Sequence, residues 1–323
     1  MATTTAQKLR VETDDFSSAE TFLRALSPQD PYWRPFPLEW VFRGHADHKW
    51  LLVPTALRND TRLGYRSYLG TGRRTTHGAQ VAVEYQMLED FITLINHYGH
   101  QLPPDVHSLW FGWNSRRELF LKATSDPEVK WPPQELKSIL ALAQHYGIPT
   151  RLLDWSKSSY VAAYFAAERA AVWLHDGFPD DKAADKLCVW ACNAGVAPRL
   201  AEASDSTLQF MVAPQEYNPN MRAQRGLFTL HIPNRTDPEA PPIAVPLDEL
   251  LGDWSRQLEV PMSPTRNDVV LRKMTLPLEE APVLLGLLTF EGITPGMLNP
   301  TLYGVVQSLQ AARYRSRPPP KSK

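Results

Sequence analysis

Apolar side chains recur at the spacing of an amphipathic α-helix in several stretches of the chain. The clearest pattern runs through residues 80–98, with apolar positions at Val81, Tyr85, Leu88, Ile92 and Ile95. The same spacing predicts helices over residues 17–26, 133–147 and 158–174, and a helical C-terminal part over 278–293 and 299–314. Gly147 and Pro149 mark the end of the helix over 133–147.

Other stretches are typical of β-strands, because they are short and rich in β-branched and aromatic residues. They are residues 40–45, 49–58, 186–193, 225–233 and 268–277. Helices and strands in this order predict an α+β fold with a mixed, mainly antiparallel sheet flanked by helices. We expect one domain over residues 15–312, with loop insertions near 60–78 and 99–132 and flexible tails at 1–14 and 313–323.

Composition and charge narrow the class of protein. The chain has 34 basic and 35 acidic residues, so its net charge gives no bulk attraction to nucleic acid. We expect a cytoplasmic protein with no membrane partner, because no apolar run approaches a signal peptide or a bilayer span. Cys188 and Cys192 lie four residues apart in a predicted strand, too far for a disulfide, and are expected to be core thiols.

Arg43 is the first candidate for chemistry, since it lies at the end of a predicted strand, directly before Gly44. An arginine fork pairs with phosphate or carboxylate, and a glycine lets a ligand approach the backbone. The alternative is an internal ion pair with a carboxylate such as that of Asp154.

A second group of candidates lies between the helices over 133–147 and 158–174. If both helices pack on a sheet, their connection passes the sheet edge, where Arg151, Asp154, Trp155 and Ser156 would face a cleft beside Arg43. Alternatively, Arg151 and Asp154 form a buried pair and Trp155 is a core residue. His145 either caps its helix or contacts the same cleft.

No metal site is expected. His45 with His48, and His97 with His100, have the spacing of metal ligands, but neither pair has an obvious third ligand. The chain also lacks the glycine-rich phosphate loops and the nucleophile elbow of common nucleotide-binding proteins and hydrolases.

Four blocks of the sequence resemble the FRG domain family. They are VFRGHADHKWLLVPTALR, LALAQHYGIPTRLLDWSKSSYVAAYFA, NMRAQRGLFTLH and EGITPGMLNPTLYGVVQSL. Together they cover roughly residues 15–312.

A weaker resemblance is to ADP-ribosyltransferases of the arginine-serine-glutamate type, and it implies a similar fold and the use of NAD. Arg43, the segment around Ser156 and Gln224 occur in the family's order, although Gln224 stands where the family has a catalytic glutamate. By this resemblance Arg43 anchors the diphosphate and Ser156 with Gln224 orients a ribose. Trp155 or Tyr146 would stack on a ring, and Glu216 or Glu168 could supply the missing carboxylate.

Two functions remain open from the sequence. The first is an enzyme that transfers ADP-ribose to an unknown macromolecular acceptor or hydrolyses NAD; a role as a bacterial toxin or phage-defence effector is implied by the resemblance. The second is a non-catalytic module that binds a nucleotide or nucleic-acid phosphate. Nucleic-acid contact would draw on the basic C-terminal residues Arg313, Arg315, Arg317, Lys321 and Lys323.

Overall fold

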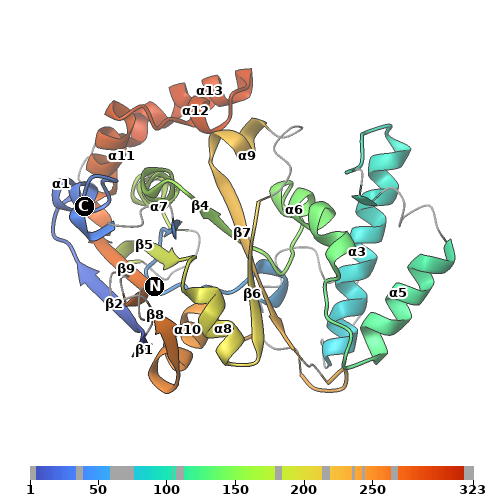
Figure 1. Cartoon of the computed structure of the whole chain (residues 1–323). Helices are drawn as coiled ribbons and strands as arrows, with labels where there is room; N and C mark the ends of the chain where they lie inside the picture. The colour runs from blue at the N-terminus through green and yellow to red at the C-terminus, as the bar shows by residue number, and fades with distance from the viewer. Residues whose placement is uncertain are drawn as a thin grey trace.

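The computed structural model describes residues 5–33, 39–58, 76–103, 105–106, 113–178, 184–212, 219–234, 237–241, 244–262 and 268–315. Within them lies a seven-stranded sheet with the strand order β2-β9-β5-β3-β4-β7-β6 (Figure 1). Only β2 and β9 pair in parallel. The predicted α+β fold with a mainly antiparallel sheet is therefore confirmed.

The seven strands of this sheet are β2 (Arg10–Asp15), β3 (Trp40–His45), β4 (Leu153–Ser156), β5 (Lys186–Asn193), β6 (Ser206–Met211), β7 (Gly226–Pro233) and β9 (Val269–Pro277). A separate antiparallel pair joins β1 (Thr5–Lys8) to β8 (Glu259–Met262). The described helices are α1 (Ala19–Ala25), α3 (His77–His97), α5 (Trp113–Ser125), α6 (Lys137–His145), α7 (Ser159–Asp176), α8 (Ala197–Ala203), α9 (Pro219–Ala223), α10 (Leu247–Gln257), α11 (Ala281–Phe290), α12 (Pro295–Leu298) and α13 (Leu302–Ala311).

The sheet has one weak joint, between β3 and β4. These strands share a single residue pair, Phe42 with Ser156, whereas β3 pairs with β5 at six positions. The joint separates a half made of β2, β9, β5 and β3 from a half made of β4, β7 and β6. Because so few ladder bonds join the halves, side chains at the joint can reach across from one half to the other.

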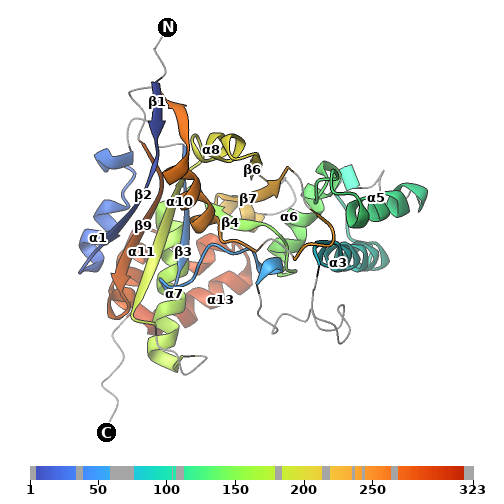
Figure 2. The ribbon, with the colours of Figure 1, turned by 90° about the horizontal axis from the view of Figure 1, so that it is seen from below.

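The helices pack against the sheet in three groups (Figure 2). α7 packs on β3 and β5, with α1 and α11 behind it, while α8 and α10 lie on the opposite face. α3, α5 and α6 form a third group that packs against β7. The last group lies away from α1, α7 and α11 across the molecule (Figures 1 and 2).

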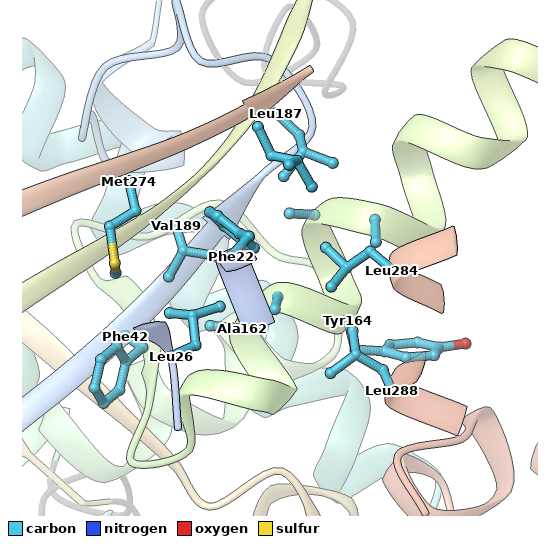
Figure 3. Packing of buried hydrophobic residues seen from close by; sticks show 14 of the residues in the cluster. Phe22, Leu26, Phe42, Ala162, Tyr164, Leu187, Val189, Met274, Leu284 and Leu288 are labelled. Carbon is cyan, nitrogen blue, oxygen red and sulfur yellow. The ribbon is translucent and has the colours of Figure 1, made fainter. Parts of the chain in front are cut away.

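The core between α7 and the sheet is built from large side chains around a helix of small ones. Phe22, Leu26 and Phe42 pack beside Ala162, and Leu284 and Leu288 of α11 close the other side (Figure 3). Alanines on α7 keep the helix close to the strands, because they project little beyond the backbone. On the other sheet face, Cys188 and Cys192 are buried free thiols, as expected, and burial raises the pKa of Cys188 to about 12.

Several elements differ from the sequence-based expectation. Residues 5–14, predicted as part of a flexible tail, form β1 and most of β2. The 99–132 insertion contains α5, whereas most of the 60–78 insertion lies outside the described residues. At the C-terminal end, 312–315 form a short 3-10 helix, in which Tyr314 donates a 2.7 Å hydrogen bond to Asp176.

Residues 49–58 form no strand. Their backbone hydrogen bonds go to unrelated partners, since the N–H of Leu52 bonds to the Asp248 carboxylate and the N–H of Ala56 bonds to the carbonyl of Thr150. This segment meets no neighbouring strand along its length, so its β-branched and aromatic residues do not become a ladder.

Gly44 marks a close approach between α7 and the sheet. A Cβ added at Gly44 would lie 1.9 Å from the carbonyl oxygen of Ala162. We predict that Gly44→Ala lowers the free energy of unfolding by about 1–3 kcal/mol or more, because it overpacks a rigid backbone contact. Urea unfolding followed by circular dichroism measures the loss.

Gly286 provides the matched control for this substitution. It lies inside α11, and an added Cβ there meets no atom within 4 Å. Gly286→Ala should keep or raise the free energy of unfolding, by up to about 1 kcal/mol, since alanine favours helix. Equal effects of the two substitutions would contradict the proposed contact.

Candidate functional site

Arg43 reaches across the joint between the two halves of the sheet. Its Nη1 donates to the backbone carbonyl of Asp154 at 2.7 Å and lies 3.4 Å from Oδ2 of the same residue. Its Nε donates to Nε2 of His45 at 2.9 Å. Among the described residues Nη2 has no hydrogen-bond partner, and the side chain keeps 16% of its surface exposed. The guanidinium is thus held by His45 from its own half of the sheet and by Asp154 from the other half, and Nη2 takes part in neither bond.

His45 fixes the orientation of that guanidinium. Arginine cannot accept a hydrogen bond, so Nε2 of His45 is the acceptor, and the ring proton is on Nδ1, 3.2 Å from the carbonyl of Trp50. Burial, and next the charge of Arg43, hold the pKa of His45 well below its usual 6.5. His45 is therefore neutral at neutral pH, as its role as acceptor requires.

A cavity of about 290 Å³ opens beside Arg43. Of the sequence-predicted site residues it is lined by Arg43, Gly44, His145, Asp154, Trp155, Ser156 and Gln224. We call it the Arg43 cavity. Its size lies near the lower end of the range for small-molecule sites, about 300–1,000 Å³. Strand β4 carries three of these residues. We expected this segment to pass the edge of the sheet, but β4 lies inside the sheet, between β3 and β7.

Asp154 is the carboxylate of the cavity. Its side chain is 53% exposed, and Oδ2 accepts from Nε2 of Gln144 at 2.8 Å in addition to its contact with Arg43. The expected alternative of an internal Arg43–Asp154 ion pair is thus present, but on an open rim. An exposed pair of this kind contributes little to stability, so it leaves both groups available to a ligand.

Ser156 and Gln224 already hold parts of the fold together. The Ser156 hydroxyl donates to the carbonyl of Gln224 at 2.8 Å and accepts from the N–H of Ser158 at 3.0 Å. Nε2 of Gln224 donates to the carbonyl of Leu298 at 3.4 Å. These bonds connect β4, the residues before β7 and α12 around the cavity, and they occupy part of the hydrogen-bonding capacity of both side chains.

Trp155 lines the Arg43 cavity but packs its indole in the core, and Tyr146 does not line the cavity. Side chains alternate along a strand, so Trp155 faces away from Asp154, into the core with Leu153 and Leu227. Its Nε1 donates to Thr229 at 2.9 Å, which supports the core alternative. Tyr146 is 68% exposed and is not among the lining residues, whereas the neighbouring His145 is, and burial lowers the pKa of His145.

Gly44 has a packing role that accounts for its identity. The missing Cβ makes room for the backbone of α7 at Ala162, so the close approach is made by a helix. The expected approach of a ligand at this glycine is therefore replaced by a contact inside the fold, although Gly44 also borders the cavity.

Arg151 does not face Asp154. It is buried, and its Nε donates to both carboxylate oxygens of Glu84 on α3, at 3.0 and 2.7 Å. The alternative of a buried Arg151–Asp154 pair is thus wrong, and so is the expectation that Arg151 faces the cleft, because Arg151 does not line the Arg43 cavity. The strand alternation explains this, because Arg151 and Asp154 belong to opposite faces of the segment.

The structure describes one of the two glutamates considered as substitutes for Gln224, and this one does not line the Arg43 cavity. Glu168 accepts from the hydroxyl of Tyr164 at 2.9 Å on α7 and is not among the lining residues; burial raises its pKa. Glu216 lies outside the described residues, as do Arg317, Lys321 and Lys323. Arg313 lies 3.4 Å from the carboxylate of Asp176.

Within the described ranges no group of three His, Cys, Asp or Glu side chains could hold a metal ion. In the same ranges, no helix combines the length and the apolar character that a membrane span requires.

Fold and site together define an α+β protein with a cavity at a joint in its sheet. The FRG domain family model matches residues 107–172, a segment that includes α6, β4 and most of α7. This match supports the resemblance to the FRG family. The matched segment contains His145, Asp154 and Ser156 but not Arg43 or Gln224. No curated protein and no solved structure matches the chain.

His45 and Gln144 are site residues that the sequence reasoning assigned to other roles or passed over. From the sequence, His45 stood out only by its metal-ligand spacing to His48, and Gln144 did not stand out at all. A signal for His45 was present, because residues two apart on a strand share a face and His45 follows Arg43 at that spacing. Gln144 carried no such signal, since its contact with Asp154 depends on how α6 packs.

The depressed pKa of His45 predicts a pH dependence. As pH falls below about 6.5 the unfolded chain takes up this proton, whereas the folded protein does so only at lower pH. The stability linked to neutral His45 is therefore complete above that value and is lost on acidification, by up to about 1.4 kcal/mol per pH unit.

Urea unfolding between about pH 7.5 and about pH 5.5 tests this against His45→Gln, whose amide oxygen can still accept from Arg43. The wild type should lose stability more steeply than the variant over this range. Parallel pH profiles would show that His45 is not the titrating group.

Proposed function

We propose that the Arg43 cavity binds NAD, and that the protein either transfers ADP-ribose to a macromolecular acceptor or hydrolyses the dinucleotide. The observation that carries the proposal is the oriented Arg43 guanidinium with its remaining Nη2, beside a cavity that also holds Asp154, Ser156 and Gln224. Roles as a bacterial toxin or phage-defence effector fit such an activity and belong to the same proposal.

The anchoring role of Arg43 follows from its hydrogen bonds. Two of its three nitrogens are fixed by His45 and the Asp154 carbonyl, so the side chain is ordered before a ligand arrives. A diphosphate oxygen would accept a charge-assisted bond from Nη2 without further loss of side-chain freedom. A cavity of about 290 Å³ encloses part of a dinucleotide, and the remainder would extend over the exposed rim formed by Asp154 and Phe165.

In this proposal the carboxylate of Asp154 is the catalytic base, a role that Gln224 cannot fill. Hydrolysis of NAD breaks the bond between ribose C1′ and the nicotinamide nitrogen, the electron pair leaves with nicotinamide, and a water oxygen bonds to C1′ as its proton passes to a base. A carboxylate stabilises the oxocarbenium-like transition state and accepts that proton. Gln224 can donate or accept hydrogen bonds to hydroxyls but cannot act as the base.

A second candidate is a module that binds a nucleotide phosphate without turnover. It is favoured by Gln224 in place of a glutamate and by the structural bonds that Ser156 and Gln224 already make. In that case the cavity keeps its phosphate anchor, and Asp154 serves to orient Arg43.

We predict that Arg43→Lys lowers NAD turnover at least about tenfold, because lysine cannot reproduce the fixed fork of arginine. Release of nicotinamide and transfer of label from NAD are the two readouts. Arg256→Lys is the matched control, since Arg256 is 72% exposed and pairs with Asp253 on α10. Turnover that Arg43→Lys leaves unchanged, or its absence in the wild type, would contradict the enzymatic proposal.

Asp154→Asn separates the two candidates. For an enzyme we expect turnover to fall about 100-fold or more while NAD still binds, because the base is removed. For a binding module, calorimetry should show binding without turnover in the wild type, equal or tighter binding in Asp154→Asn and loss of binding in Arg43→Lys. Binding that survives Arg43→Lys would contradict both candidates.

A further inference from the structure

A second cavity lies on the other face of β4 and β7. It is bordered by Leu153 and Thr229 from these strands and by Leu247 and Leu250 of α10, and we call it the Arg151 cavity. Three nitrogen-bearing side chains line it: His77 at the start of α3, Arg151 before β4, and His231 on β7. Leu153 and Asp154 are neighbours on one strand, so this cavity and the Arg43 cavity lie back to back.

Each of these three side chains carries a buried polar atom without a hydrogen-bond partner among the described residues. The atoms are Nη2 of Arg151, Nδ1 of His77 and Nε2 of His231. Arg151 and His77 are each only 7% exposed. A buried polar group left without a partner costs about 1–3 kcal/mol, so three of them around one cavity indicate a missing hydrogen-bond partner.

The nearest carboxylate cannot supply that partner. Glu84 receives Nε of Arg151 on both oxygens, and also Nε1 of Trp131 at 2.7 Å and the side-chain amide of Gln80. Each oxygen of Glu84 thus already accepts two hydrogen bonds. An acceptor for Nη2 of Arg151 therefore has to come from elsewhere.

The chemistry of the three atoms selects the kind of partner. Arginine only donates, so whatever meets Nη2 must be an acceptor. Each neutral imidazole can carry its proton on either ring nitrogen, so both histidines can donate to the same acceptor. Burial, and next the charge of Arg151, lower the pKa of His231 to about 4, and burial and Arg151 do the same for His77. A metal cation is disfavoured, because it would lie beside the guanidinium.

We propose that the Arg151 cavity is a binding site for a small carboxylate-sized anion, held by Arg151, His77 and His231. The free space is about 30 Å³, roughly the room of two waters. Two carboxylate oxygens fit both this space and the three donors, whereas a tetrahedral oxyanion is too large. The apolar lining from Leu153, Leu247 and Leu250 suits the carbon side of such a ligand.

Formate is the probe, with sulfate as the larger anion and chloride at equal ionic strength as the reference. The wild-type unfolding temperature should rise with formate concentration relative to chloride, whereas sulfate should give only its general salt stabilisation, equal in the wild type and in His77→Phe/His231→Phe. His77→Phe/His231→Phe keeps ring shape but removes two donors, and should lose most of the formate effect. Arg43→Lys, which alters the other cavity, should retain it, so the result is independent of the proposed NAD site.

A formate-soaked crystal of the wild-type protein gives a second measurement that needs no variant. Planar density bonded to Nη2 of Arg151 and to one or both histidines is the expected result. Water alone in the cavity at high formate concentration, or an equal formate response in the double histidine variant, would overturn the proposal.

Discussion

One hydrogen bond spans the weakest line in the sheet, from Nη1 of Arg43 to the backbone carbonyl of Asp154. β3 and β4 share only one residue pair, so this bond does part of the work that a ladder does elsewhere. Arg43 is also one of the residues that line the Arg43 cavity. The side chain that joins the two halves is therefore also the one that would anchor a ligand in the proposed function, and its orientation depends on a buried, neutral His45.

Much of the architecture could be predicted from the sequence, because long periodic segments carry their own signal. The helices α3 and α7 and the strands β5, β7 and β9 lie where hydrophobic periodicity and β-branched residues placed them. β4 was missed as a strand because it has four residues and includes a charged one. β1 and β2 were missed because polar residues dominate them, and their strand character depends on pairing with β8 and β9.

The candidate site was predicted in part. Arg43, Asp154, Ser156, Gln224 and His145 meet at one cavity, as the sequence suggested, because their positions follow from the order of strands and helices. The partners of Arg151 and Trp155 could not be predicted, since these depend on which face of a short strand each residue takes. Glu84 lies 67 residues before Arg151, and only the packing of α3 brings them together.

The alternation along β4 has a consequence for how this segment can vary. Asp154 and Ser156 serve one cavity, while Arg151, Leu153 and Trp155 serve the opposite face. Inserting or deleting a single residue between Thr150 and Ser156 would exchange the two sets, driving a carboxylate into the core and an indole into the open. Related chains should therefore keep the length of this segment strictly constant while tolerating length changes in the loops around it.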